Sequence, residues 1–316
     1  MQIVKAYRSA AKAVSASVNA EATATIFRGN CSSLLEKLPD SSVDLIVSSP
    51  PYCMGKEYES NQDIGAFETS HASVMPELVR VLKPGASLCW QVGWYTRLGV
   101  LTPLDYLVYA EMQKHREMQL RNRIIWTFGH GLHCNNRFSG RHETVLWFTK
   151  GKDYLFDLDA VRVAQKYPGK LHSKGPKKGL PSGNPLGKNP GDVWEIPNVK
   201  SNHIEKTDHP CQFPVGLVHR LVRALTREGA LVLDPFCGVA STGVAALLEK
   251  RRFLGAELVD EYVGIGINRL LETAGGKVQF RPAEQEIYVP GPTEKVARRP
   301  ATFSNLAMED RALVGH

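Results

Sequence analysis

The 316-residue sequence lacks a membrane-spanning segment, because no apolar run approaches the roughly 18 residues that a membrane helix needs. Cysteine is scarce, and no two cysteines have the paired spacing of a metal site. The six are scattered along the chain: Cys31, Cys53, Cys89, Cys134, Cys211 and Cys237. Free thiols suit a reducing cytoplasm. We therefore expect a cytoplasmic protein with no membrane partner, no disulfides and no metal.

Both ends of the chain lack the patterns of stable structure. The first 20 residues are rich in Ala and Ser and hold no acid, only Lys5, Arg8 and Lys12 as charges. This composition resembles an organellar transit peptide, although a frayed terminal helix fits it better. The residues after Glu286 are rich in proline and charge without periodicity. We expect a flexible N-terminal segment, 1–20, and a flexible C-terminal tail, 286–316.

Acidic residues are also scarce in one internal stretch, which carries most of the chain's net charge of +7. Between Ala160 and Lys206 there are nine Lys or Arg against three acids. Of the 24 residues from 168 to 191, eleven are Gly or Pro, which excludes regular secondary structure. A concentrated basic stretch is typical of a partner with a phosphate backbone, and a solvated basic loop is the alternative. The residues that we expect to contact such a backbone, and so to bind a nucleic acid such as DNA if the partner is one, are Arg162, Lys166, Lys170, Lys174, Lys177, Lys178 and Lys188.

The rest of the chain alternates short apolar runs with helical patterns. Strands are predicted at 43–47, 87–92, 124–128, 143–149, 230–233 and 253–258. Helices are predicted at 74–82, 103–115, 214–226, 242–249 and 261–273. Strands that alternate with helices predict an α/β fold, a doubly wound and mainly parallel sheet that is covered on both faces.

One strand–loop–helix unit has the layout of a nucleotide-type site. The strand ends at Asp234, the loop contains Gly238, and a second strand ends at Glu257 about twenty residues later. Glycine lets a ligand approach the backbone, and one carboxylate can accept hydrogen bonds from both hydroxyls of a ribose. The loop lacks the lysine of a phosphate loop and the dinucleotide fingerprint, so a cofactor without phosphates fits better. An ordinary strand–turn–helix unit remains the alternative.

A second motif, Ser49-Pro50-Pro51-Tyr52, follows the strand at 43–47. Two prolines end the strand in a rigid turn whose carbonyl has no competing amide donor nearby. The exocyclic amine of a nucleobase is a poor nucleophile, and acceptors aimed at its hydrogens favour the tetrahedral geometry needed for attack. Ser49 and the turn supply such acceptors, while Tyr52 supplies a flat face for a base flipped out of a duplex. A strand-ending turn with a core tyrosine is the alternative interpretation.

Together these pieces resemble the β-group of DNA amino-methyltransferases from restriction–modification systems, over roughly residues 26–271. The resemblance rests on 27–31, 49–52, 209–214, 234–238 and 251–257, with the catalytic motif before the cofactor motif, an order specific to the permuted group. It implies S-adenosylmethionine as the cofactor and double-stranded DNA as the substrate. It implies a bacterial, archaeal or phage-encoded enzyme, and it allows a cognate restriction endonuclease and a homodimer as further partners.

The resemblance also assigns roles to residues. It implies catalysis by Ser49, Pro50, Pro51 and Tyr52. The implied cofactor-binding residues are Gly29, Asn30, His209, Asp234, Phe236, Gly238, Ser241, Thr242 and Glu257. Three positions depart from the family pattern: Asn30 replaces a common Asp, Ala240 replaces a second Gly, and Ser49 replaces the Asp of many adenine enzymes.

The expected organisation is therefore a catalytic half, 21–159, a basic target-recognition insertion, 160–206, and a cofactor-binding half, 207–285. Ser49 is typical of enzymes that methylate N4 of cytosine, which makes N4-cytosine the predicted target and N6-adenine the alternative. Two other hypotheses compete. Methyltransferases that act on protein glutamine also use a Pro-Pro-Tyr turn, but they resemble the unpermuted order. A non-catalytic nucleic-acid-binding module with a decayed cofactor site is the other, and Asn30 and Ala240 favour it.

Overall fold

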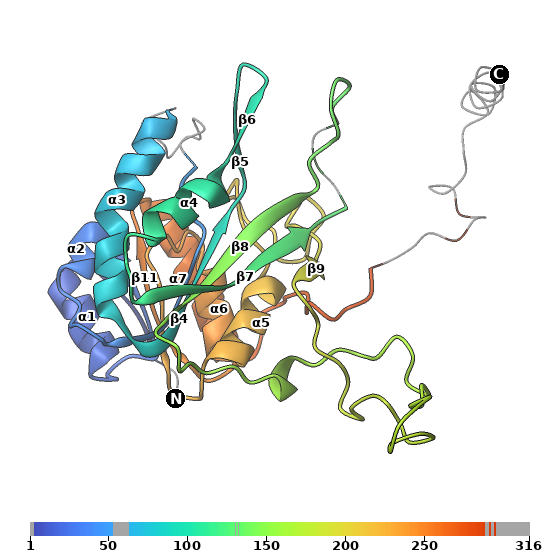
Figure 1. Cartoon of the computed structure of the whole chain (residues 1–316). Helices are drawn as coiled ribbons and strands as arrows, with labels where there is room; N and C mark the ends of the chain where they lie inside the picture. Colours follow the sequence, from blue (N-terminus) through green and yellow to red (C-terminus); the bar gives the residue numbers. More distant parts are fainter. Residues whose placement is uncertain are drawn as a thin grey trace. The chain divides into compact units, whose positions relative to one another are not determined.

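A nine-stranded sheet organises the described part of the chain (Figure 1). The computed structural model describes residues 3–52, 63–129, 131, 133–287, 291 and 294. Residues 1–284 form one compact unit and residues 285–316 a second. All the described helices and strands lie in the first unit. The predicted C-terminal tail lies mostly outside the described residues.

The sheet is parallel through its first six strands, in the order β1-β2-β11-β10-β3-β4-β8-β7-β9. Strand β8 then pairs antiparallel with both β4 and β7, and the short β9 pairs parallel with β7. The strand bounds are β1 Val4–Tyr7, β2 Ala24–Arg28, β3 Val43–Ser48, β4 Leu82–Val92, β7 Met118–Thr127, β8 His142–Lys150, β9 Val193–Glu195, β10 Leu231–Asp234 and β11 Arg252–Glu257. A separate hairpin is formed by β5 Trp94–Arg97 and β6 Val100–Pro103.

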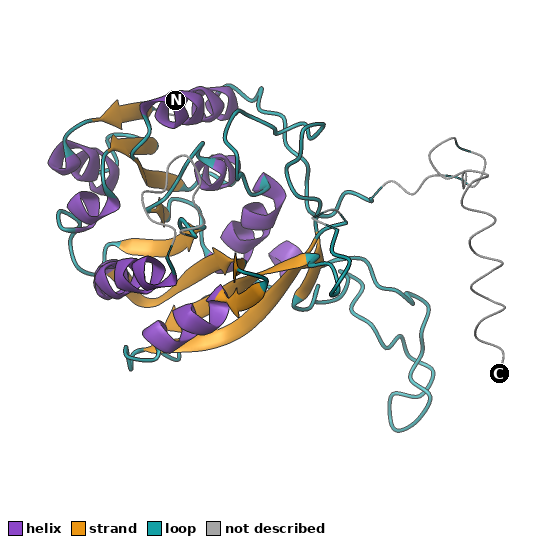
Figure 2. Cartoon of the chain, turned by 90° about the horizontal axis from the view of Figure 1, so that it is seen from above, coloured by secondary structure: helices purple, strands orange, loops and turns teal. Residues whose placement is uncertain are grey.

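Two layers of helices cover the two faces of this sheet (Figure 2). One layer contains α1 Ala10–Val18, α2 Cys31–Leu35, α3 Ile64–Val81 and α4 Leu104–Met112, and the other α5 Val215–Leu225, α6 Ser241–Leu248 and α7 Asp260–Ala274. Side chains alternate between the faces of a strand. In β4, Leu88 and Trp90 therefore join the core of the first layer, whereas Cys89 joins that of the second. The predicted doubly wound α/β fold is confirmed.

The prediction of a flexible N-terminal segment is wrong. Residues of this segment form β1, which pairs with β2 from Val4↔Ala24 onward, and α1, capped by Ser9. Ala13, Val14 and Ala16 are buried in α1. Small side chains give a weak hydrophobic signal in a sequence, yet they let a helix pack closely against a sheet. The Ala-rich composition that suggested fraying is therefore what allows this helix to pack.

Several elements differ from the sequence-based expectations. The helix predicted at 74–82 begins at Ile64, because the Asp63 side chain accepts a hydrogen bond from Gly65 N and caps the helix there. The hairpin β5–β6 and strands β2 and β9 were not predicted. The basic stretch from 162 to 192, fully described, has no helix or strand and only two isolated bridges, Val163↔Lys188 and Leu171↔Pro181. Among the described residues, no helix is long and apolar enough to cross a membrane.

Candidate active site

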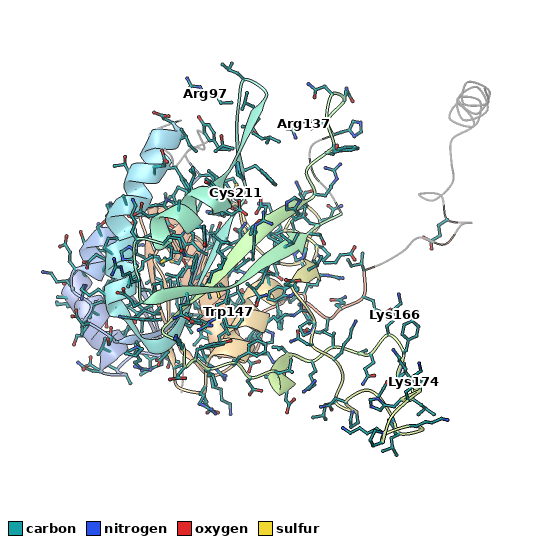
Figure 3. All side chains as sticks on the ribbon, in the orientation of Figure 1. Arg97, Arg137, Trp147, Lys166, Lys174 and Cys211 are labelled. Atoms are coloured by element: carbon teal, nitrogen blue, oxygen red, sulfur yellow. The ribbon has the colours of Figure 1, made fainter. Side chains whose placement is uncertain are left out.

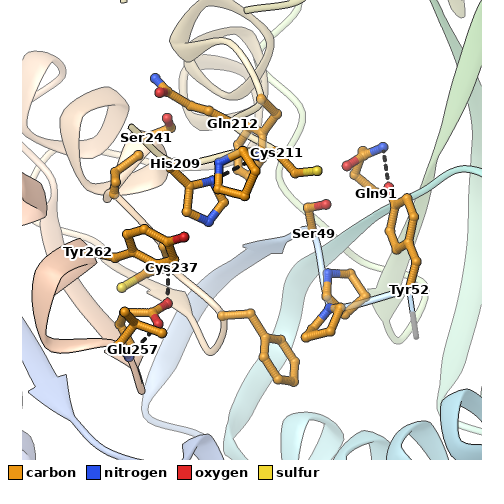
Figure 4. A pocket seen from close by; sticks show the side chains of 18 of the residues that line it. Ser49, Tyr52, Gln91, His209, Cys211, Gln212, Cys237, Ser241, Glu257 and Tyr262 are labelled. Carbon is orange, nitrogen blue, oxygen red and sulfur yellow. Dashed lines mark hydrogen bonds between the residues drawn. The ribbon is translucent and has the colours of Figure 1, made fainter. Parts of the chain in front are cut away.

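A cavity of about 390 Å³ opens where the parallel strands β2, β3, β10 and β11 end. This is the edge at which open α/β sheets bind ligands. Its wall includes most of the residues singled out in the sequence: Gly29, Asn30, Ser49, Pro50, Pro51, Tyr52, His209, Phe236, Gly238, Ser241 and Glu257. In Figure 4, Ser49 and Tyr52 lie across the cavity from His209 and Glu257.

Asp234 and Thr242 do not line this cavity, contrary to the contact expected of them. Both are fully buried, and Thr242 Oγ1 donates to Asp234 Oδ2 at 2.6 Å. Asp234 Oδ1 accepts from Ser48 Oγ at 2.6 Å and from Phe236 N at 3.1 Å. The Asp234 carboxylate therefore holds the loop between β10 and α6 from its buried side and does not face the cavity.

The bond between Ser48 and Asp234 joins the two motifs, because β3 carries one and β10 the other. Burial raises the pKa of Asp234 to about 6, although the three hydrogen bonds favour its ionised form. The carboxyl thus depends on those donors to stay charged at neutral pH. Asp234 therefore fixes the end of β3, from which the Ser49–Tyr52 turn begins, relative to the loop that contains Gly238.

Glu257 closes the loop from the neighbouring strand. Its Oε2 accepts from Gly238 N at 3.0 Å, and its Oε1 accepts from Val259 N at 2.8 Å. Each carboxylate oxygen has a further lone pair, so the side chain can still accept hydrogen bonds from a ligand in the cavity. Burial raises the pKa of Glu257, opposed by the backbone donors.

His209 packs over the glycine of the loop. A Cβ added at Gly238, whose φ is +50°, would lie 3.2 Å from His209 Nε2. The His209 ring meets the Tyr262 ring edge-on at 4.5 Å. Burial, with Lys206 nearby, lowers the pKa of His209 to about 4, so the imidazole is neutral at physiological pH. Gly238 keeps this part of the cavity free of side-chain atoms.

Ala240 adopts the left-handed conformation, with φ +60°, at the N-cap of α6. This conformation favours glycine, so the departure at this position is accommodated with backbone strain. At a second departure, Asn30 caps α2, and its Oδ1 accepts from Ser32 N at 2.9 Å. Ala240 and Asn30 thus each stand where a loop of the cavity wall ends and a helix begins.

On the opposite wall, Tyr52 belongs to a polar cluster that sequence reasoning missed. Gln91 Nε2 donates to the Tyr52 hydroxyl at 2.9 Å and also to Glu143 Oε2. Burial raises the pKa of both Tyr52 and Glu143, and the neighbouring Glu143 raises that of Tyr52 further. Gln91 is the second-to-last residue of β4, and Glu143 is the second residue of β8. A polar residue at each of these strand ends was the available signal.

Aromatic rings complete the cavity wall near this cluster. Trp126 and Phe128 line the cavity, with their rings edge-on at 5.2 Å. Together with Tyr52 they offer flat apolar surfaces, while Ser49, Gln91 and Glu143 offer hydrogen-bonding groups. Such a combination can hold a planar heterocycle and bind its polar edge.

The predicted DNA-contacting residues lie apart from the cavity. Figure 3 shows Lys166 and Lys174 on the projecting irregular segment, away from Cys211 of the cavity wall. The lysines at 166, 170, 174, 177, 178 and 188 are exposed. Arg162 is different, because its guanidinium is bound to Asp159 at 2.6 Å and to Gly187 O at 3.0 Å. It holds the base of the segment in place. Among the described residues, no group of His, Cys, Asp or Glu could hold a metal.

Comparison with known proteins points to one family. A family model described as DNA methylase (N6_N4_Mtase) matches residues 43–268. Type II methyltransferase M.BglII of Bacillus subtilis is 46% identical over 241 residues, which cover 76% of this chain and 67% of that protein. DNA adenine methyltransferase YhdJ of Escherichia coli K12 is 30% identical over 253 residues, which cover 78% of this chain and 80% of that protein.

A solved structure is similar over the same region. A protein of Thermus thermophilus, TTHA0409, assigned as a DNA modification methylase and complexed with S-adenosyl-L-methionine, superposes with a TM-score of 0.57. The match has 26% identity and covers 79% of this chain and 96% of that one.

Proposed function

The chain belongs to the DNA methylase family (N6_N4_Mtase), and from this premise we propose that it transfers a methyl group from S-adenosylmethionine to N4 of cytosine in duplex DNA. The target base is flipped out of the helix into the cavity. One observation carries the proposal. The Ser49–Tyr52 turn, the loop that contains Gly238 and the end of β11 at Glu257 line the same cavity, and the bond from Ser48 Oγ to Asp234 Oδ1 joins β3 to β10.

The residues at the carboxyl ends of β10 and β11 fit the cofactor. The related Thermus protein holds S-adenosyl-L-methionine. Here Gly238 leaves open the space that a Cβ would fill beside His209, and Glu257 presents a partly exposed carboxylate for the two ribose hydroxyls. We propose that Phe236, His209 and Ser241 contact the remainder of the cofactor from the same wall. Asp234 and Thr242 act behind them by fixing the loop.

The opposite wall prepares the base for transfer. S-adenosylmethionine supplies an electrophilic methyl group on a sulfonium. We propose that Ser49 and the Pro50 carbonyl accept hydrogen bonds from the exocyclic amine, which concentrates its lone pair on nitrogen and stabilises the developing positive charge. As the bond from nitrogen to the methyl carbon forms, the bond from that carbon to sulfur would break, S-adenosylhomocysteine would leave as a neutral thioether, and the methylated amine would lose one proton to water. Tyr52 stacks against the ring of the base. Neutral His209 adds no positive charge beside the sulfonium.

The choice of base rests on Ser49. A serine at this position is typical of N4-cytosine enzymes, and a hydroxyl is a weaker acceptor than a carboxylate, so the Pro50 carbonyl carries more of the interaction. The relative YhdJ is named a DNA adenine methyltransferase, which favours the alternative, N6-adenine. The permuted order, with the Ser49 motif before the Asp234 loop, supports assignment to the β-group. A cognate restriction endonuclease and a homodimer belong to the same proposal.

Sequencing of DNA from a methylation-free host that expresses this chain tests the proposal. We expect N4-methylcytosine at a short defined site, and unmodified DNA from a host that carries the empty vector. N6-methyladenine at the site would overturn the base assignment and leave the cofactor assignment intact. Unmodified DNA in the presence of folded protein would contradict the proposed activity.

The basic insertion is proposed to bind the DNA backbone outside the cavity. Lys170, Lys174, Lys177 and Lys178 are exposed, which leaves them available to phosphates. Replacing all four with glutamine is expected to weaken DNA binding and to flatten its salt dependence, because each phosphate contact adds about 0.9 to the slope of log K against log salt. Titrations of a labelled duplex at several salt concentrations measure this slope.

A matched variant separates local contacts from net charge. Replacing the exposed Lys5, Lys12, Lys37 and Lys277 with glutamine removes the same number of charges from other elements. This control should leave the slope nearly unchanged, and both variants should bind S-adenosylmethionine normally. Equal slopes for the two variants would exclude the insertion as the binding segment.

A further inference from the structure

Two projections rise from the wall of the cavity. The first is the hairpin β5–β6, which follows the end of β4, where Gln91 lines the cavity (Figure 1). The second is the connection between β7 and β8, which is flanked by Phe128 and Glu143, two further residues of the cavity wall. Their bases are joined, because Trp94 Nε1 donates to the His142 carbonyl at 3.3 Å and the two rings meet edge-on at 5.2 Å.

The tip of the hairpin is an unfavourable local structure. The register Arg97↔Val100 leaves Leu98 and Gly99 as a two-residue turn, and both have positive φ, +51° and +79°. Turns of this kind favour Asn, Asp or Gly at the first position. A leucine there is strained, because its Cβ crowds the backbone in the left-handed conformation.

Leu98 gains no packing in return for this strain, since 95% of the side chain is exposed. A strained apolar residue at full exposure breaks two local preferences at one position, and such outliers concentrate at functional sites. The ladder of β5 and β6 pairs the two strands up to Arg97 and Val100, the residues that flank the tip. The neighbouring Arg97 is also exposed and can contact a phosphate.

We propose that Leu98 is the wedge that enters the DNA duplex and occupies the space left by the flipped base. This inference rests on the proposed function and adds the residue that opens the helix. Apolar side chains such as leucine separate base steps in this way in other DNA-binding proteins. Leu98 stands at the tip of a paired hairpin that follows the cavity-lining end of β4, so we infer that it reaches the stack while the target base lies against Tyr52.

Phe138 is the rival, because it is fully exposed on the second projection. It lies in residues 133–141, the continuous described part of the connection between β7 and β8, which has no strand pairing. A side chain on a hydrogen-bonded hairpin is held in position as it enters a base stack, whereas one on an irregular loop can be displaced. We therefore assign the wedge to Leu98 alone.

The experiment compares methylation of two duplexes that contain the site found by sequencing. In one the target base is paired, and in the other it lies opposite an abasic position. Leu98→Asn should lower kcat/KM at least tenfold on the paired duplex and restore it to within about threefold of wild type on the unpaired one, because unpaired bases are easier to extrude. Asparagine suits the turn, so the melting temperature should not fall.

Val100→Thr and Phe138→Ser are the controls, since each changes an exposed apolar residue on one of the two projections. Both should methylate paired and unpaired duplexes like the wild type. Equal loss on both duplexes in Leu98→Asn, no loss at all, or a defect of Phe138→Ser that the abasic position rescues would each overturn the assignment. A wild-type protein that methylates neither duplex would instead refute the proposed function itself.

Discussion

Replacing Tyr52 with alanine is expected to lower the single-turnover rate of DNA methylation by roughly 5- to 150-fold, because stacking of a base on an aromatic ring contributes about 1–3 kcal/mol. Tyr52 lies directly after the Pro-Pro turn on the cavity wall, across from His209 and Glu257 (Figure 4). Without the ring, a flipped base has no flat surface on that side. Rates measured with saturating S-adenosylmethionine and DNA isolate this effect from binding.

Tyr52→Phe is the matched control. It keeps the ring and removes the hydroxyl, which accepts a hydrogen bond from Gln91 at 2.9 Å and is also hydrogen-bonded to Ser49 and Glu143. The loss should be clearly smaller than that of Tyr52→Ala, because the ring that stacks on the base remains. Full activity in the alanine variant, or an equal loss in both variants, would exclude stacking as the role of this residue.

Replacing Glu257 with alanine is expected to raise the Kd for S-adenosylmethionine by roughly 10- to 150-fold, because hydrogen bonds to charged groups contribute about 1.5–3 kcal/mol net of their exchange with water. Calorimetry measures the Kd directly. Burial raises the pKa of Glu257, so affinity in the wild type should also fall on acidification as this carboxyl takes up a proton. That acid dependence should be weaker in the alanine variant.

Glu257 also holds the loop through Gly238 N and Val259 N, so a loss of affinity alone does not identify the contact. Competition with adenosine and 2′,3′-dideoxyadenosine makes the distinction. The wild type should prefer adenosine, and Glu257→Ala should lose that preference. A variant that weakens both ligands equally would show that the carboxylate only shapes the loop.

The elements that the sequence predicted well are those with strong local signals. Strands β3, β10 and β11 are short apolar runs that end in turn or acidic residues, and their carboxyl ends share one edge because the strands are parallel. That geometry alone brings Ser49 and Gly238 to one cavity. The position of His209 could not be predicted in this way, because this residue lies in irregular chain outside these strands and their loops. Only the family resemblance pointed to it.

What the sequence missed depends on non-local pairing. Gln91 and Glu143 meet only because β4 and β8 run antiparallel in a register that pairs Gln91 with Val145. The hairpin tip at Leu98 lacks the Asn-Gly signal that marks such turns. Asp234 was expected to face the ligand, but its burial and its partner Ser48 could be known only once β10 and β3 were neighbours.

The most direct test of the account is methyl transfer by the purified chain from labelled S-adenosylmethionine to duplex DNA that contains the site found by sequencing. Nucleosides from the treated DNA are separated and identified by mass spectrometry. The account predicts label in N4-methylcytosine, formed by the wild type and strongly reduced in Tyr52→Ala. A protein that binds both DNA and S-adenosylmethionine but leaves the DNA unlabelled would contradict it and would identify the chain as a non-catalytic DNA-binding module.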